Sequence, residues 1–391
     1  MQPWRRNQYV MVVTVFVVFA GFAFVLPFLP LFVRELGVTS DDEVALWSGV
    51  LIGIGPLIAG LLAPLWGRLA DRHGQKTMAL VALGAYVVLL ALSAGARSVY
   101  DLLAARIGLG LFGGIGPLGL AMATSQGPRE ETGRAVGLIE AAKILSAAIG
   151  PFAGGALASA VGSRRTFVAA ALVCVVAFGL VAFLYDPGPR RAPDVAGGKS
   201  LSLRGLIGLP EMGLLLVVLF FVNFIGRSYT PILPLHLRLL GVPAGSLALF
   251  TGVLISIYSI AAAVSATTLG RVCRDLPPRG LLIASLVGGA ATVLPMALVP
   301  RFGLLLVFAV LLGLASGGAL TLCYTIGGLG VPGEFRTTAF GYFSAAALFG
   351  GAVSPSVAGL VAHWNLRGIY YVNAALFLLL AGLLALRRRS R

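Results

Sequence analysis

Charged residues, cysteines and histidines are scarce in this sequence. Of its 391 residues only 11% are charged, 3 are cysteines and 3 are histidines. The cysteines show no paired spacing, which excludes a disulfide framework, and no histidine stands at metal-ligand spacing from a second ligand. No Gly-x-x-x-x-Gly-Lys-Ser/Thr loop occurs, which argues against ATP-driven transport by this chain. We expect no metal and no cofactor, and we interpret His236 and His363 as polar residues at the ends of helices.

Apolar residues are abundant instead. The sequence is 58% hydrophobic and its mean hydropathy is +0.97, which excludes a water-soluble fold of this size. Because a bilayer core of about 30 Å needs roughly 20 apolar residues per helix, the sequence predicts an all-α membrane protein with twelve transmembrane helices. The predicted spans are 8–33, 45–66, 78–96, 102–123, 135–161, 166–185, 212–237, 247–269, 280–299, 302–325, 337–362 and 368–386.

The net charge of +15 would suit a nucleic-acid-binding protein, but the positions of the basic residues indicate another role. If the spans alternate in direction, most of the 29 Lys and Arg residues fall on the side of Met1. The positive-inside rule then places both termini in the cytoplasm. We expect a multi-pass protein of the cytoplasmic membrane, whose basic loops set its topology, and no nucleic-acid partner.

The sequence repeats itself across its longest polar interruption. Residues 27–38 (PFLPLFVRELGV) match residues 231–242 (PILPLHLRLLGV) at an offset of 204. A parallel duplication of six spans is the plan of transporters whose substrate site lies between two halves. We predict an N-terminal six-helix bundle at 1–185, a cytoplasmic linker at 186–211 and a C-terminal six-helix bundle at 212–391. The alternative is a duplicated scaffold that does not transport.

The loop between predicted spans 2 and 3 carries a family motif. It reads GRLADRHGQK, and its key residues are Gly67, Asp71, Arg72, Gly74 and Lys76. The glycines permit a tight turn and a close helix approach, and the charged side chains can bond to helix ends. The loop resembles that of the major facilitator superfamily, which implies a latch that stabilises one conformation of the transport cycle. The alternative is ordinary positive-inside charge.

Predicted span 5 carries a second motif, with Gly150, Pro151, Gly154 and Gly155. Small residues let helices pack closely, and the proline removes a backbone hydrogen bond so that the helix can bend. The pattern is similar to the signature of the drug:proton antiporters of that superfamily, although Ser146 stands where the fuller pattern has glycine. The alternative is a kinked packing helix. Arg134, at the start of the same span, completes the predicted gating set.

Further stretches extend the resemblance over most of the chain. Gly21 precedes Pro27 and Pro30 in span 1, and Arg106 precedes several glycines in span 4. The second-half counterpart of the latch loop, residues 270–277, is degenerate, so we expect a weaker latch there. The resemblance implies two pseudo-symmetric six-helix bundles, the major facilitator fold, with Arg106 in the place of the family's proton-relay arginine. A hydrogen-bond anchor between helices is the alternative role for Arg106.

Ionisable residues inside spans are costly and mark functional sites. Glu140 is the one acid of fourteen that we place inside a span, and desolvation there would raise its proton affinity. We predict that Glu140 carries the coupled proton. Lys143 lies three residues further along the same helix face, so the two side chains either neutralise one another or form a pair that exchanges partners during the cycle.

Arg227 lies near the middle of span 7, and no acid occurs in the second-half spans to pair with it. We predict that it contacts substrate, while a purely structural arginine is the alternative. Aromatic and amide residues at similar depth are further candidates to line an amphipathic cavity, and a lipid-facing position is the alternative for the aromatic ones. They are Phe19, Phe24, Asn223, Phe224, Tyr258, Tyr324, Tyr342 and Phe343.

These residues favour a proton-coupled exporter of amphipathic small molecules that works by alternating access. We expect its partners to be that substrate, protons and membrane lipid, and we expect a monomer. Three cations against one acid in the spans also fit a transporter of an anionic substrate, such as an acidic lipid, a sugar phosphate or an organic acid. A membrane receptor or an enzyme is the remaining alternative, but no nucleophile with its base is visible, so we expect no enzyme.

Overall fold

The computed structural model describes residues 2–124, 128, 131–187, 202–272, 276–332 and 335–387. Within these ranges the chain is helical and contains no strand. The helices are α1 (Pro3–Val25), α2 (Leu29–Glu35), α3 (Asp41–His73), α4 (Gln75–Ala94), α5 (Val99–Leu111), α6 (Ile115–Thr124), α7 (Thr132–Val161), α8 (Ser163–Gly179), the π-helix η2 (Leu180–Leu184), α9 (Leu203–Gly208), α10 (Met212–Ser228), α11 (Leu233–Leu239), the 3₁₀ helix η3 (Ala244–Ser246), α12 (Leu247–Val272), α13 (Pro278–Met296), α14 (Phe302–Gly330), α15 (Arg336–Trp364) and α16 (Gly368–Arg387).

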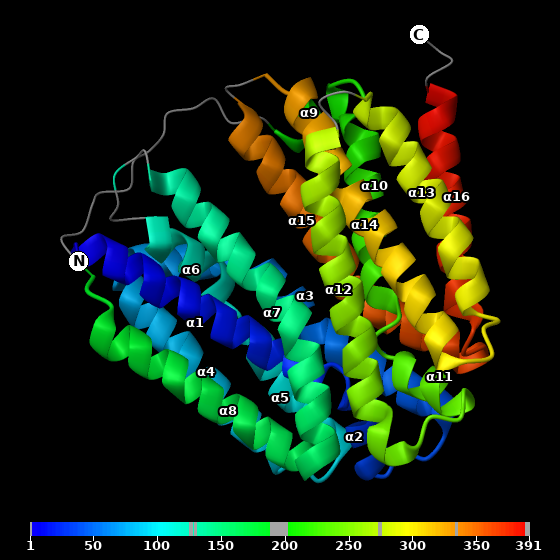
Figure 1. Ribbon diagram of the computed structural model, residues 1–391. Coiled ribbons are helices and arrows are strands. Elements are labelled where there is room, and N and C mark those ends of the chain that lie inside the picture. The colour runs from blue at the N-terminus through cyan, green and yellow to red at the C-terminus, as the bar shows by residue number, and fades with distance from the viewer. Residues whose placement is uncertain are drawn as a thin grey trace. The chain divides into compact units, whose positions relative to one another are not determined.

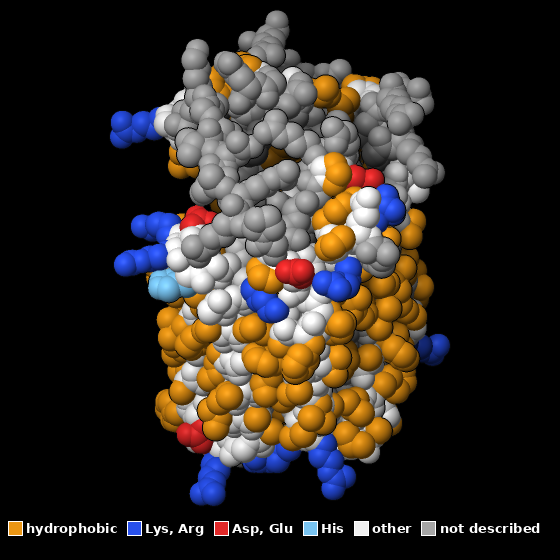
Figure 2. All heavy atoms as spheres, turned by 90° about the vertical axis from the view of Figure 1, so that its left-hand side faces the viewer, with side chains coloured by type: hydrophobic (Ala, Val, Ile, Leu, Met, Phe, Trp, Pro, Cys, Tyr) orange, Lys and Arg blue, Asp and Glu red, His pale blue; other side chains and the backbone are white. Residues whose placement is uncertain are grey.

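Eleven helices among the described residues are long and apolar enough to cross a membrane, and the bent pair α10 and α11 makes up to twelve. The face in Figure 2 is covered largely by hydrophobic side chains, with Lys and Arg gathered toward its upper and lower ends. Apolar side chains such as Val88, Leu92, Leu172 and Val176 are more than half exposed. Such a surface suits lipid rather than water. The chain is a multi-pass membrane protein of the predicted class.

Two predicted spans are interrupted, contrary to the prediction of continuous helices. The first predicted span, 8–33, is divided between α1 and α2, and the seventh, 212–237, between α10 and α11, which meet at a bend of 47°. Pro27 and Pro231 lie in these breaks, because proline lacks the backbone N–H and clashes with the preceding turn. The fourth predicted span, 102–123, is one candidate membrane span from Val99 to Thr124, in which a short turn separates α5 from α6.

The helices cluster into two units. One contains residues 1–40, 50–194 and 243–256, and the other contains residues 41–49, 195–242 and 257–391. Thus α3 contributes its first residues to the second unit, and α12 contributes its first residues to the first unit. The predicted domain boundaries at 185 and 212 remain a prediction. Helix α9 lies inside the predicted linker, and residues 188–201 of that linker lie outside the described residues.

In the first unit, α1 packs against α7 and α8, and α4 packs against α8, as Figure 1 shows. Two small residues of α7 make the α1 contact close. Ser146 Oγ donates to the Phe16 carbonyl at 2.8 Å and to the Ala142 carbonyl at 2.7 Å. A Cβ on Gly150 would lie 2.6 Å from the Ala23 Cβ. Only small side chains therefore fit at this crossing.

The second unit repeats this crossing at the predicted register. Helices α10 and α15 pack as α1 and α7 do. A Cβ on Gly350 would collide with the Phe220 carbonyl, and Ser354 Oγ donates to the Phe224 carbonyl. Gly350 and Phe220 lie 204 residues after Ser146 and Phe16. At the two equivalent positions the first unit has Ser146 and Gly150, and the second unit has Gly350 and Ser354.

Glycines also set a second repeated crossing. A Cβ on Gly110 of α5 would lie 2.8 Å from the Gly55 carbonyl of α3, and a Cβ on Gly313 of α14 would lie 2.5 Å from the Tyr258 carbonyl of α12. Both residues of the second pair follow the first by 203 positions. The close backbone contacts therefore repeat at the same sequence offset as the residues themselves.

Candidate functional site

Glu140 and Lys143 form an ion pair on α7. Lys143 Nζ donates to Glu140 Oε1 at 2.7 Å, and the side chains are 51% exposed for Glu140 and 26% for Lys143. The ammonium also lies over the Phe19 ring of α1, 5.8 Å from its centroid, within the range of a cation–π contact. The carboxylate is thus open to solvent or ligand, while the lysine lies between it and an aromatic face.

Arg106 is buried in the first unit. It is 6% exposed, and its guanidinium lies 5.8 Å from the Phe167 ring centroid. Among the described residues, its Nε and one Nη have no hydrogen-bond partner. A buried guanidinium with unused donors is costly. The structure therefore places Arg106 inside the bundle, where it could hold an anion, water or carbonyl.

Arg227 lies in the second unit near the end of α10, and its side chain is exposed although the residues on either side are at least partly buried. Tyr258 of α12 fills the space beside it, since a Cβ on Gly226 would lie 2.7 Å from the Tyr258 hydroxyl. Asn223, one turn earlier, donates to the Leu219 carbonyl of its own helix at 3.1 Å. The structure thus brings Arg227 and Tyr258 together and leaves Asn223 partly satisfied by backbone.

The other predicted substrate residues differ in exposure. Phe24, Tyr324 and Tyr342 are partly exposed, and the Tyr324 hydroxyl lies 3.5 Å from Ser344 Oγ. Phe224 and Phe343 are only 5% and 0% exposed. The last two are buried packing residues, which corrects the prediction that they line a cavity. Helix periodicity in an apolar span cannot separate a lining face from a packed one.

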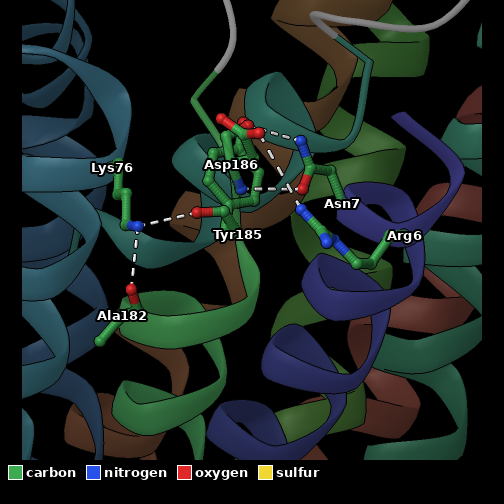
Figure 3. A network of polar contacts seen from close by, with 6 residues as sticks. All are labelled: Arg6, Asn7, Lys76, Ala182, Tyr185 and Asp186. Carbon is green, nitrogen blue, oxygen red and sulfur yellow. Dashed lines mark hydrogen bonds and ion pairs between the residues drawn. The ribbon is translucent and has the colours of Figure 1, made fainter. Parts of the chain in front are cut away.

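Lys76 is the residue of the latch loop with the clearest structural role (Figure 3). Its Nζ donates to the Ala182 carbonyl at 2.9 Å and to the Tyr185 carbonyl at 2.7 Å. These carbonyls end the sixth span, where helix C-termini lack partners and favour a cation. Beside them, Asn7 exchanges two hydrogen bonds with the Asp186 backbone, at 2.6 and 3.0 Å. The loop therefore ties α4 to the end of the sixth span.

The remaining residues of the loop behave differently. Gly74 has a φ of 95°, which favours glycine, whereas a Cβ on Gly67 would meet no atom of the described residues within 4 Å. Among the described residues, Gly67 therefore makes no close helix approach, and its role in gating remains a prediction. Asp71 and Arg72 are exposed. Arg134 lies 3.5 Å from Glu131. Of the degenerate second-half loop, residues 273–275 lie outside the described residues.

The glycines of span 5 make backbone contacts within the first unit. A Cβ on Gly154 would collide with the backbone of Phe24, and a Cβ on Gly155 would collide with the Ala248 carbonyl. Gly252 is packed against the Pro151 carbonyl in the same way. The pattern read as a signature is thus a packing requirement at each of these positions. Its role in gating remains a prediction.

Sequence reasoning missed a buried polar group in the second unit. His236, expected at an interface, is 1% exposed and its Nδ1 lies 2.6 Å from the Tyr370 hydroxyl. Asn373 donates to Ser228 at 2.7 Å. A comparison of the two halves of the sequence repeat could have indicated these residues, because the equivalent positions of the first half are apolar. The described residues contain no group of three or more His, Cys, Asp or Glu that could hold a metal.

Comparisons with known proteins agree over nearly the whole chain. A family model described as Major Facilitator Superfamily matches residues 11–254 and 216–391. The chain is 31% identical over 377 residues to the multidrug resistance protein MdtG of Proteus mirabilis, covering 95% of this chain and 93% of that protein. It is 32% identical over 394 residues to MdtG of Escherichia fergusonii, covering 99% and 96%.

Solved structures share the fold at lower identity. A bacterial homolog of the human lysosomal transporter Spinster superposes with a TM-score of 0.81 at 16% identity, covering 100% of this chain and 98% of that chain. The human organic anion transporter MFSD10 gives 0.67 at 18% identity, covering 98% and 100%. At such identities the likeness concerns the fold alone.

Proposed function

The chain belongs to the Major Facilitator Superfamily, and from this we propose that it exports amphipathic small molecules from the cytoplasm in exchange for protons. The observation that carries the proposal is its full-length likeness, at 31–32% identity, to multidrug resistance proteins. We place it in the cytoplasmic membrane with both termini inside, on the charge distribution of its loops. Its substrate class, direction and coupling ion all belong to the proposal.

The ion pair on α7 supports the proton-coupled part. Glu140 is half exposed while Lys143 lies against Phe19, so an arriving proton or cation competes with Lys143 for the carboxylate. Protonation removes the attraction and frees the ammonium, which then lies against the Phe19 ring without its ionic partner. If two conformations of the protein solvate this ion pair differently, protonation of the pair favours one of them. A proton gradient then changes the relative populations of the two conformations.

Purified protein in liposomes tests this proposal. We expect an imposed pH gradient to drive accumulation of amphipathic cations, and Glu140→Gln to lower the gradient-driven rate at least about tenfold, because a fixed neutral amide cannot exchange a proton. Lys143→Gln should weaken the pH dependence rather than abolish binding. Full gradient-driven transport by Glu140→Gln would remove this carboxylate from the mechanism.

Arg227 favours a second candidate, transport of an anionic substrate. It is an exposed cation on an apolar helix, beside the hydroxyl of Tyr258, and a guanidinium binds carboxylate or phosphate in bidentate fashion. Uptake of amphiphiles that are matched in size but differ in charge decides between the two candidate functions, proton-coupled export and transport of an anionic substrate. If the substrate is anionic, Arg227→Gln costs about 1.5–3 kcal/mol of binding. Equal binding by wild type and Arg227→Gln across the panel would exclude the anion site.

A further inference from the structure

A cluster of buried polar side chains lies where α10, α11 and α16 meet in the second unit. It consists of Ser228, Tyr229, His236, Tyr370 and Asn373, each at most 6% exposed. The helix break between α10 and α11 places Tyr229 and His236 on either side of the bend. Tyr370 and Asn373 lie one turn apart on α16, and therefore on the same face.

Contacts link the five residues of the cluster into one continuous row of side chains, which we call the file. The His236 Nδ1 is 2.6 Å from the Tyr370 hydroxyl, and the Tyr370 ring is stacked on Tyr229 with centroids 5.3 Å apart. The Tyr229 hydroxyl lies beside the Asn373 amide and the Ser228 hydroxyl, and Asn373 donates to Ser228 at 2.7 Å. The file thus ends at Ser228, the residue next to Arg227.

Three atoms of this file lack a hydrogen-bond partner among the described residues: His236 Nε2, the Tyr229 hydroxyl and Asn373 Oδ1. Buried polar atoms almost always have a partner, and where protein supplies none, ordered water does. Water bound to these three atoms would complete the path from the histidine to Ser228.

The first unit shows that the fold does not require polar residues here. At the equivalent positions, offset by 204 for His236 and by 203 for Tyr370 and Asn373, the sequence has Phe32, Phe167 and Ala170. Phe32 and Phe167 pack with ring centroids 5.1 Å apart, against 5.3 Å for His236 and Tyr370. At these three positions apolar side chains give the same ring packing, with the Arg106 and Arg164 guanidinium groups lying over Phe167 and Phe32. The buried histidine and its partners therefore carry a desolvation cost that ring packing alone does not explain.

We propose that this cluster is a proton relay, which brings the coupled proton from the Gly368 end of α16 to the depth of Arg227. The inference rests on the proposed proton coupling and adds to Glu140 a delivery path in the other half of the chain. In the topology proposed above, the Gly368 end of α16 faces the outside, where protons enter during export.

The transfer is balanced at each atom. In the tautomer whose Nδ1–H donates to Tyr370, Nε2 accepts an incoming proton. The Nδ1 proton then passes to the Tyr370 oxygen as the tyrosine gives its own proton to water beside Tyr229, and His236 is left neutral in its other tautomer.

The test replaces the polar pair with the pair that the first unit already uses. His236→Phe combined with Tyr370→Phe should fold, because Phe32 and Phe167 pack in the same way. We expect this variant to retain gradient-free ethidium exchange in proteoliposomes and to lose pH-gradient-driven ethidium accumulation at least about tenfold. Tyr371→Phe, which alters an exposed tyrosine next to Tyr370 on α16, should keep both. Undiminished accumulation by the double variant would overturn the relay.

Two further readouts separate failure of the relay from failure of the proposed function. If wild-type protein accumulates ethidium equally with and without a pH gradient, proton coupling itself is wrong and the relay with it. Independently of transport, ¹⁵N-histidine spectra of the whole protein should show the His236 resonance, assigned by its loss in His236→Phe, changing protonation or tautomer with pH. That change should be altered by Tyr370→Phe. A His236 resonance that does not respond to pH would contradict the proposal.

Discussion

At the scale of single residues, several polar side chains of this apolar protein bond to backbone carbonyls of other helices. Ser146 bonds to α1, Ser354 to α10, and Lys76 to the end of the sixth span. Each of these bonds forms where water is scarce, so a lost partner is not replaced by solvent. Lys76 is the charged member of this group, and its two short bonds make it the most readily tested.

Replacing Lys76 with Met should destabilise the folded protein. The change removes two charge-assisted bonds to the Ala182 and Tyr185 carbonyls, which is a loss of about 1–2 kcal/mol for a partly buried cation at a helix C-terminus. Thermal unfolding in detergent should therefore show a lower Tm, and Lys76→Arg should lie between Met and wild type. Arg68→Met is the matched control, because Arg68 is exposed and donates to Pro64 of its own helix at 3.3 Å. Equal Tm values for Lys76→Met and Arg68→Met would contradict this role.

At the scale of helices, glycine decides how closely they approach. The four crossings at Gly110, Gly150, Gly313 and Gly350 leave no space for a Cβ, and small residues at interfaces let helices associate in a bilayer, where the hydrophobic effect cannot drive them together. Other glycines of the same helices, such as Gly137, face no described atom within 4 Å. The number of glycines therefore says little until each is placed on a helix face.

Gly154 and Gly137 of α7 provide a matched pair. Gly154→Ala should destabilise the protein by at least about 2 kcal/mol, because the new methyl group meets the backbone of Phe24, which cannot move aside like a flexible side chain. Gly137→Ala should leave stability unchanged or raise it by about 0.5–1 kcal/mol through helix propensity. The yield and Tm of both variants in the same detergent make the comparison. Similar values for the two would show that the α1–α7 crossing is not tight.

At the scale of the whole molecule, the two units share helices. Residues 41–49 of α3 belong to one unit and the rest of α3 to the other. Within its unit the first segment is attached by polar contacts: His363 Nδ1 lies 3.2 Å from Asp42 Oδ2, and Arg238 pairs with Asp41. If alternating access rocks the two halves, a helix common to both must shift against one of them.

Crosslinking this segment tests that requirement. In a cysteine-free background, Asp42→Cys and His363→Cys joined by a short bifunctional thiol reagent should stop net transport while leaving substrate binding intact, and reduction should restore the rate. Each single cysteine treated with the same reagent is the control. Transport at the full rate by the crosslinked protein would show that residues 41–49 stay fixed on their unit and that α3 bends elsewhere.

The sequence by itself determined the class of fold. Apolar runs of bilayer length require helices, because no other single segment satisfies its backbone inside lipid. The repeat, at an offset of 203 or 204 residues, set a register that the contacts of Ser146, Gly350, Gly110 and Gly313 reproduce. The breaks after Val25 and Ser228 fall inside spans that were predicted as continuous, and Pro27 and Pro231 lie in them.

Only the tertiary structure decided which side chains face one another. Every face of a membrane helix is apolar, so periodicity could not show that Phe343 is packed, that Arg227 is exposed, or that Lys76 caps a helix 106 residues away. The same holds for His236 and Tyr370, 134 residues apart in sequence and 2.6 Å apart in space. Their proximity is a property of the packed bundle, because a polar contact inside a membrane protein exists only where two helices bring both partners to the same depth and the same face.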